Sequence, residues 1–238
     1  MYYDSITIKL INITFMDFAL FSFAPNINKD IYIKDPSSSD LGRSIILESI
    51  GMIDDLGFED FTFKKLAIKI NSTEATIYRY FENKHKLLIY LTSWYWSWIE
   101  YQMALKNTNI RPAIERLRNA ISVLTHAGNY QNEHLDIHRL FKIICLESSK
   151  SYMIKNVDKN NKFGFYFNYK KIVSNISDII LEINPTYKYP HMLVSTMIEG
   201  IHHQEYFSLH LPSLTDKYEN EDFIYDFYTQ MTLLSISK

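Results

Sequence analysis

The chain has 238 residues, of which 47% are hydrophobic and 22% are charged, and its formal net charge is −2. This hydrophobic fraction suffices for a packed core, so a wholly disordered chain is excluded. The slightly acidic balance is a mild argument against a nucleic-acid binder, although phosphate neutralisation needs only local positive charge. The single cysteine, Cys145, excludes a disulfide within the chain, and its apolar neighbours predict a buried, inert thiol.

Neither membrane crossing nor secretion is predicted. The longest apolar stretch, residues 13–24, is interrupted by Asp17 and is shorter than the ~20 residues needed to cross a bilayer. It also lacks the basic start and the small-residue cleavage site of a signal peptide. We therefore expect a cytoplasmic protein with no membrane partner.

The first 40 residues differ from the rest and are expected to form an N-terminal arm. Two short runs, 18–23 and 29–34, are rich in aromatic or β-branched residues and are separated by a stretch that contains Pro25. They predict either a short β hairpin or a disordered arm. Residues 35–40 have the composition of a linker, and Asp40 is a candidate helix cap.

From residue 41 the helical period takes over. Because the chain has only six glycines and six prolines, we expect an all-α protein. Ile46, Ile50 and Ile53 form the apolar stripe of a first helix, which Gly57 is expected to close. Later helices are predicted at about 112–126, 133–152, 163–183, 190–210 and 218–236, and 156–161 is predicted as a loop. The expected parts are the arm over 1–40, a DNA-binding domain over 41–90 and a helical domain over 91–238.

Two short helices are predicted directly after the first helix, joined by a tight turn. Thr62 is expected to cap a helix over 63–70, Thr73 a short third helix, and Asn83 a long fourth helix that runs to about residue 101. Asn71, in the turn, tolerates a positive φ. Such a pair, with its second helix capped and exposed, is the minimal device for entering the DNA major groove. The order of these elements therefore predicts a helix-turn-helix.

A set of residues across these helices and their turns also carries a family resemblance. Its members are Gly57, Phe58, Thr62, Leu66, Ala67, Thr76, Ile77, Tyr78, Phe81, Lys84, Leu87 and Leu88. In this spacing they resemble the signature of the TetR family of transcriptional regulators, over roughly residues 45–90. Asn71 and Ser72 depart from that signature, because they stand where a glycine and a valine are usual. The resemblance implies a three-helix DNA-binding domain followed by a helical domain that binds a ligand and forms a homodimer.

The resemblance further implies which residues contact DNA. Thr62 and Lys64, at the start of the second helix, would touch phosphates, and Lys84 would hold a phosphate at the start of the fourth helix. The candidates for base or backbone contact on and after the recognition helix are Thr73, Glu74, Ala75, Thr76, Tyr78, Arg79 and Tyr80. Glu74 either accepts a hydrogen bond from cytosine N4 or only caps its helix. The implied partner is double-stranded operator DNA, and the implied activity is that of a ligand-responsive repressor.

The charge of this region leaves a second interpretation open. Between Arg43 and Tyr90 seven basic residues are balanced by seven acidic ones, although most of the acidic residues precede Phe61. We therefore expect modest non-specific affinity for DNA. The alternative is a helical ligand-binding or interaction module whose helix-turn-helix is vestigial.

The helical domain offers a candidate ligand pocket. Trp94, Trp98 and Tyr101 recur on one helical face and form either ordinary core or the floor of an aromatic pocket. Phe141 and Phe167 would line the same space, together with Met153 and Phe163. The expected effector is an apolar or aromatic small molecule. The family resemblance also implies that the last two helices form the homodimer interface.

Metal binding and catalysis are not expected. His134 and His138 have the one-turn spacing that can grip a metal, but no third ligand is evident. No nucleophile-elbow pattern, phosphate loop or framed pair of carboxylates occurs. We therefore predict no enzyme, no cofactor and no metal, and retain an all-helical metalloenzyme around these two histidines only as a further alternative.

Overall fold

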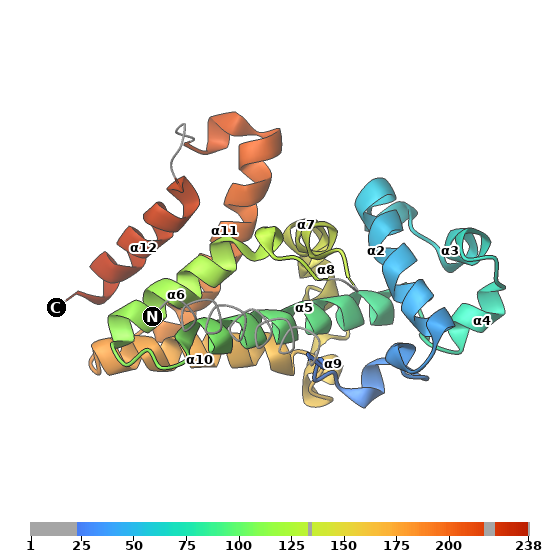
Figure 1. Ribbon diagram of the computed structural model, residues 1–238, viewed down its shortest axis with the longest axis horizontal. Helices are drawn as coiled ribbons and strands as arrows, with labels where there is room; N and C mark the ends of the chain where they lie inside the picture. Colours follow the sequence, from blue (N-terminus) through green and yellow to red (C-terminus); the bar gives the residue numbers. More distant parts are fainter. Residues whose placement is uncertain (1–22, 133–134, 217–221, 238) are drawn as a thin grey trace, which may run out of the picture.

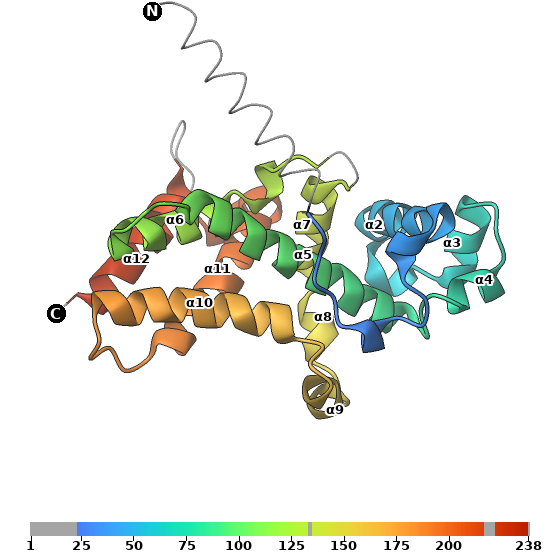
Figure 2. The same cartoon turned by 60° about the horizontal axis from the view of Figure 1, so that its bottom comes forward.

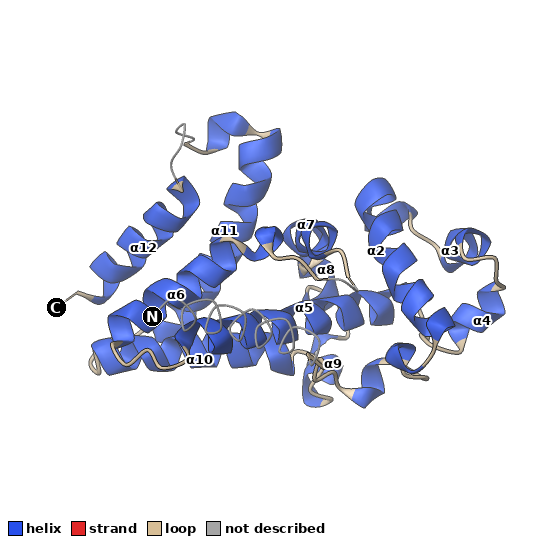
Figure 3. Ribbon diagram, viewed as in Figure 1, coloured by secondary structure: helices blue, strands red, loops and turns tan. Residues whose placement is uncertain are grey.

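The computed structural model describes residues 23–132, 135–216 and 222–237, and in this part of the chain every regular element is a helix (Figures 1 and 3). The N-terminal elements are η1 (Lys29–Ile31), η2 (Pro36–Ser38), α2 (Asp40–Asp60), α3 (Phe63–Lys69) and α4 (Glu74–Tyr78). The central elements are α5 (Lys84–Asn107), α6 (Ala113–Thr125), η3 (Ala127–Asn129), α7 (Ile137–Glu147) and α8 (Ser149–Tyr152). The last are α9 (Val157–Lys162), α10 (Phe167–Ile183), α11 (Pro190–His210), η4 (Pro212–Leu214) and α12 (Phe223–Ile236). The prediction of an all-α protein is confirmed.

The first long helix, α2, forms as its apolar stripe predicts. Ile46, Ile50 and Ile53 are all buried, and they pack into the core. Gly57 adopts a φ of 77°, the left-handed conformation that interrupts a regular helix. The predicted cap is wrong by one residue, because the Ser39 hydroxyl and not Asp40 accepts the hydrogen bond from the Gly42 amide.

The two short helices form through the predicted caps. The Thr62 hydroxyl accepts from the amide of Lys65 at 3.2 Å, and the Thr73 hydroxyl accepts from the amide of Thr76 at 3.3 Å. These bonds satisfy amides that a helix start leaves without a partner. Asn71 takes a φ of 51° in the turn between the helices. Leu66, Ala67, Ile77 and Phe81 are buried between α3, α4 and the rest of the core.

Helix α5 is the central element of the molecule. It runs from the short helices into the helical body, and it extends past the predicted end near residue 101 to Asn107 (Figure 1). Most of its residues are buried, and they lie on all faces of the helix, because α6, α7, α8 and α10 all pack against it. A helix surrounded in this way is apolar on all its faces.

The later helices form, but the breaks between them lie at other residues than predicted. The helix expected over 133–152 is divided at Ser148 into α7 and α8. The loop expected over 156–161 forms the short helix α9, and Gly164, at a φ of 76°, separates α9 from α10. The predicted start of the last helix, 218–221, lies outside the described residues, and α12 begins at Phe223.

The N-terminal arm is a strap and not a hairpin where it is described. Residues 18–22 lie outside the described part, and the predicted second strand contains the 3₁₀ helix η1. The Asn28 side chain accepts from the Asp30 amide and turns the backbone, and Ile31 becomes buried in the core. Residues 23–39, called the N-terminal strap below, run along α5 and pass α4 before α2 begins (Figure 2). Within the described residues, no helix is long and apolar enough to cross a membrane.

Candidate nucleic-acid interface

Helix α4 presents most of its surface to solvent. Only Ile77 of its five residues is buried, and Thr73, Ala75, Tyr78 and Arg79 are exposed. It lies with α3 at one end of the molecule, away from α10, α11 and α12 (Figure 1). The helix is therefore accessible along its length.

The start of α3 shares this accessible end. Thr62 and Lys64 are exposed there, and the ring of Phe63 packs edge-on against Tyr78 with the centroids 5.1 Å apart. Glu74 and Thr76 are partly exposed on α4, and the Thr76 hydroxyl lies 2.8 Å from that of Thr73. The structure thus brings these predicted contact residues together on two neighbouring helix starts.

Tyr80 is a correction to the predicted contact set. Its side chain is only 3% exposed, and its hydroxyl lies 2.8 Å from the hydroxyl of Ser39 in the strap. The ring is covered because the strap returns over the end of α4. A duplex cannot reach this ring, so Tyr80 supports the surface from below.

Lys84 is the second correction. Its ammonium group donates to the carbonyls of Phe58 and Glu59, each at 2.9 Å, and to that of Phe61 at 3.3 Å. It also lies 4.8 Å from the centre of the Phe58 ring. A lysine has three donors, and all three point at the end of α2. Lys84 therefore joins α5 to the end of α2 and is not presented to a phosphate.

The cations of this end are consequently few. Lys65 donates to the carbonyl of Asp60 at 2.8 Å, and Lys69 lies 3.9 Å from Glu48. Lys64 and Arg79 are exposed and have no side-chain hydrogen bond or ion pair to the residues that the structure describes. Lys64 and Arg79 are therefore the two cations of α3 and the end of α4 that the described fold leaves without a side-chain partner.

The predicted aromatic pocket is already filled. Phe23 of the strap packs against Trp94, Trp98 and Tyr101, with ring centroids 5.5, 5.1 and 5.2 Å apart. No pattern around residue 23 predicts this contact. The aromatic face of α5 is therefore core, covered by the strap.

The other two predicted pocket residues lie elsewhere. Phe141 is buried between Tyr95 and His202, and Phe167 is 55% exposed near the ammonium group of Lys171. The five predicted residues hence do not surround one space. Met153 and Phe163 are also largely exposed, because the chain turns outward around α8 and α9.

A cleft of about 1210 Å³ lies beside α2. Its walls include Leu47 and Arg43 of α2, Trp94 of α5, and Ile137 and His138 of α7. Of the predicted pocket residues, Trp94 alone lines it. The cleft thus separates the helix-turn-helix end from the helical body.

Polar contacts join α2 to α7 next to this cleft. The Arg139 guanidinium lies 3.3 Å from Asp55 and 3.5 Å from Asp54. At the other end of α7, the buried Glu147 carboxylate accepts from the backbone amide of Phe58 at 3.1 Å. Two separate points of α2 are therefore held by one helix of the body.

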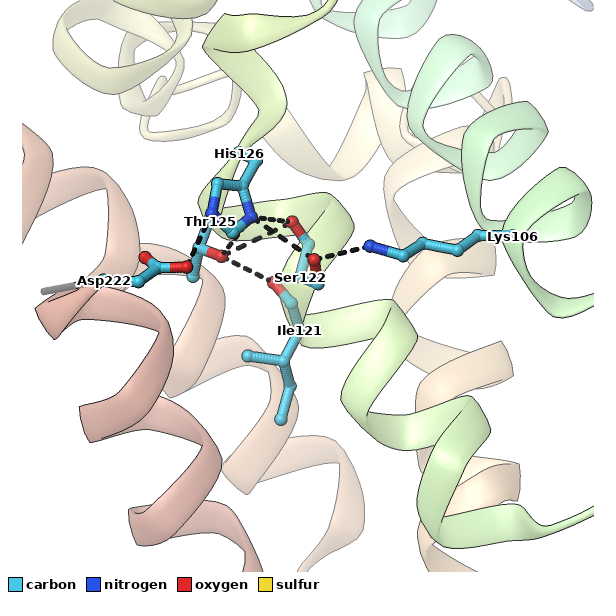
Figure 4. Close-up of polar contacts among 6 residues, drawn as sticks. All are labelled: Lys106, Ile121, Ser122, Thr125, His126 and Asp222. Carbon is cyan, nitrogen blue, oxygen red and sulfur yellow. Dashed lines mark hydrogen bonds and ion pairs between the residues drawn. The ribbon is translucent and has the colours of Figure 1, made fainter.

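A further polar cluster superficially resembles a catalytic triad (Figure 4). The Ser122 hydroxyl lies 3.3 Å from Nδ1 of His126, and Nε2 of His126 lies 2.7 Å from Asp222. However, Nδ1 is only 2.7 Å from the Ser122 carbonyl, which can accept but not donate a hydrogen bond. Nδ1 is thus placed to donate to this carbonyl, whereas a triad requires the nitrogen beside the hydroxyl to accept its proton. The cluster connects the end of α6 to the start of α12.

The histidine pair proposed for a metal gains no support. His134 lies outside the described residues, and the ring of His138 is 3.3 Å from the carbonyl of Gly128. In the described part of the chain, no three metal-ligating side chains are close enough together to hold an ion. Cys145, predicted to be buried, is partly exposed, although desolvation raises the pKa of its thiol well above the ordinary value.

A capped, exposed short helix on a three-helix unit, followed by a larger helical body, defines the fold of the TetR-family regulators. A regulatory protein of that family from Rhodococcus RHA1 is 13% identical, has a TM-score of 0.58, and is matched over 84% of this chain and 98% of that one. The AibR complex with isovaleryl coenzyme A and operator DNA is 18% identical, with a TM-score of 0.55 over 79% and 96% of the two chains. The chain therefore has a TetR-like fold.

The same fold also occurs in a protein that is named as a superantigen and not as a regulator. The superantigen PfiT is 10% identical, with a TM-score of 0.55, and is matched over 84% of this chain and 97% of that one. No protein-family model and no curated protein matches the sequence. Because one fold carries different functions, the function must be argued from the residues.

Proposed function

We propose that this chain is a sequence-specific DNA-binding transcriptional regulator that acts as a homodimeric repressor. The observation that carries the proposal is the exposed helix α4, whose first turn is capped by Thr73 and whose surface offers Ala75, Tyr78 and Arg79. The start of such a helix meets base edges in the major groove, and Lys64 and Arg79 supply charge for the phosphates.

The proposed dimer uses the last two helices. Met192 of α11, and Phe227 and Leu234 of α12, are large apolar side chains with 67%, 56% and 66% of their surface exposed. Apolar side chains of this size gathered on two adjacent helices are typical of a protein interface. A twofold axis through them would pair two α4 helices, which a dimeric operator requires at a spacing of about 34 Å or more.

The test is a fluorescence-anisotropy titration of the DNA upstream of the chain's own gene at about 100 mM salt. We expect selective binding over a scrambled duplex, and Arg79→Ala should abolish most of it, whereas Lys188→Ala at a distant exposed loop should not. Light scattering should give twice the 28.2 kDa of one chain. Absence of selective binding, or a monomeric mass in the bound and free protein, contradicts the proposal.

The vestigial-motif alternative is favoured by one observation, the engagement of Lys84 by three carbonyls. It removes a cation that the family resemblance assigns to a phosphate. This alternative predicts that Arg79→Ala changes nothing in the titration. The two functions are therefore separated by the same variant.

Ligand response is the remaining part of the proposal. An occupant of the cleft beside α2 would touch both halves, since Leu47 of α2 and Ile137 of α7 both line it. Control of DNA binding requires only that the occupant prefers one arrangement of these walls. The AibR structure contains both isovaleryl coenzyme A and operator DNA, so this fold accommodates both kinds of ligand in one protein.

The probe 1-anilinonaphthalene-8-sulfonate, which is apolar and aromatic, tests this step in the same titration. We expect its fluorescence to rise on binding and the affinity for DNA to fall severalfold. Leu47→Asp should remove both effects, and Leu105→Asp, at a comparably exposed leucine outside the cleft, should retain them. Probe binding that leaves DNA affinity unchanged contradicts ligand control through this cleft.

A further inference from the structure

The N-terminal strap is anchored to the helical body at its first residues. Phe23 inserts between the aromatic rings of α5, as described above. The Asn26 amide donates to the Ser97 hydroxyl at 3.1 Å, and the Asn26 carbonyl accepts from the Asn168 side chain at 2.8 Å. The strap therefore leaves the body from a fixed point.

The other end of the strap is anchored to the end of α4. The Ile33 amide donates to the Tyr80 carbonyl at 2.8 Å, and the Ser39 hydroxyl lies 2.8 Å from the Tyr80 hydroxyl. Between these two bonds, the ammonium group of Lys34 lies 5.0 Å from the centre of the Tyr80 ring. Three contacts thus fix the strap beside the recognition helix.

This position places a further cation beside the end of α4. Lys34 is exposed, and Tyr80, whose ring it lies over, directly follows Arg79 in the chain. The neighbouring Asp35 is turned into η2, where one carboxylate oxygen accepts from the amide and the hydroxyl of Ser37 at 2.8 and 2.7 Å. Its charge is thereby partly compensated within the strap.

We propose that the strap is a third element of the DNA interface, in which Lys34 contacts a backbone phosphate next to the one met by Arg79. Tyr80 acts as the positioning residue, because it holds the strap on both sides of Lys34. This inference rests on the proposed function. Its partner is the sugar-phosphate backbone of duplex DNA, which is recognised by charge and not by sequence.

The test measures the salt dependence of DNA binding for the full chain. Lys34→Ala is expected to weaken binding roughly threefold to tenfold on specific and scrambled duplexes alike, and to reduce the slope of log K against log salt by about 0.9. Lys188→Ala, at the other end of the molecule, is the matched control and should keep the wild-type slope. The thermal unfolding midpoint of Lys34→Ala should fall by only about 1 to 3 °C, because the exposed side chain loses a single cation–π contact with Tyr80.

A second variant separates positioning from folding. Tyr80→Phe keeps the ring below Lys34 and removes only the hydroxyl bonded to Ser39. It should also lower the salt slope, which a purely structural defect would leave unchanged. A wild-type slope in Lys34→Ala, together with loss of binding in Arg79→Ala, overturns the strap inference and leaves the proposed function intact. If the wild-type chain binds no duplex, both are overturned.

Discussion

The recognition helix and the central helix of the body are stabilised in opposite ways. In α4 one residue of five is buried, whereas α5 buries 15 of its 24 residues, including Trp94, Trp96 and Trp98. Burial of such rings supplies most of the folding free energy of a helix in a protein. Helix α4 instead depends on its cap and on the strap and α3 beside it. The surface proposed to meet DNA is therefore the part of the fold with the least core of its own.

This difference extends to how the two halves respond to pH. His202 of α11 is fully enclosed in the body, between the rings of Trp96 and Phe141. Its Nδ1 has no hydrogen-bond partner among the described residues. Burial lowers the pKa of His202 to about 4, while Glu199 raises it and His203 lowers it further by smaller amounts. The helix-turn-helix has no buried histidine of this kind in the described chain.

The largest predicted effect is therefore an acid instability of the body. Between pH 6.5 and about pH 4, the unfolded chain binds a proton at His202 that the folded chain does not bind. The free energy of unfolding falls as the pH is lowered through this window, on the order of 3 kcal/mol in total. The contribution of the neutral His202 side chain to stability is therefore fully present only above pH 6.5. Urea unfolding at pH 7.5 and pH 4.5 measures the loss.

Two variants isolate this histidine from the carboxylates that titrate nearby. His202→Leu should make the free energy of unfolding less dependent on pH than in the wild type. His203→Leu, at the exposed neighbouring position, should keep most of the wild-type dependence, because His203 makes only a small contribution to the lowered pKa of His202. If the free energy of unfolding depended equally on pH in the wild type and both variants, His202 would not be the cause of the acid instability of the body.

The sequence predicted the helix-turn-helix closely because its determinants are local. Thr62, Thr73 and Asn83 each accept a hydrogen bond from an amide three residues later, so a cap can be recognised within one turn. The positive φ of Gly57 and Asn71 follows from residue type in the same way. Neither feature requires knowledge of distant contacts.

The errors concern contacts between residues far apart in the chain. Lys84 meets carbonyls 23 to 26 residues earlier, and the Asn26 amide meets Ser97 across 71 residues. A lone lysine or aromatic residue does not reveal which distant surface it will meet. For this reason the family resemblance places Lys84 and Tyr80 at the DNA, whereas both contact distant parts of the chain, and no local pattern predicts that Phe23 covers the aromatic face of α5.

The smallest predicted effect tests the local side of the comparison. Thr73→Ala removes the hydroxyl that accepts from the Thr76 amide, and it should lower the free energy of unfolding by about 1 kcal/mol. Thr73→Ser, which keeps the hydroxyl, should restore most of that loss in urea unfolding. Because α4 has so little buried surface, the same substitution should weaken DNA binding by more than its effect on stability implies. A binding loss no larger than the stability loss would mean that the strap and α3 hold α4 in place without its cap.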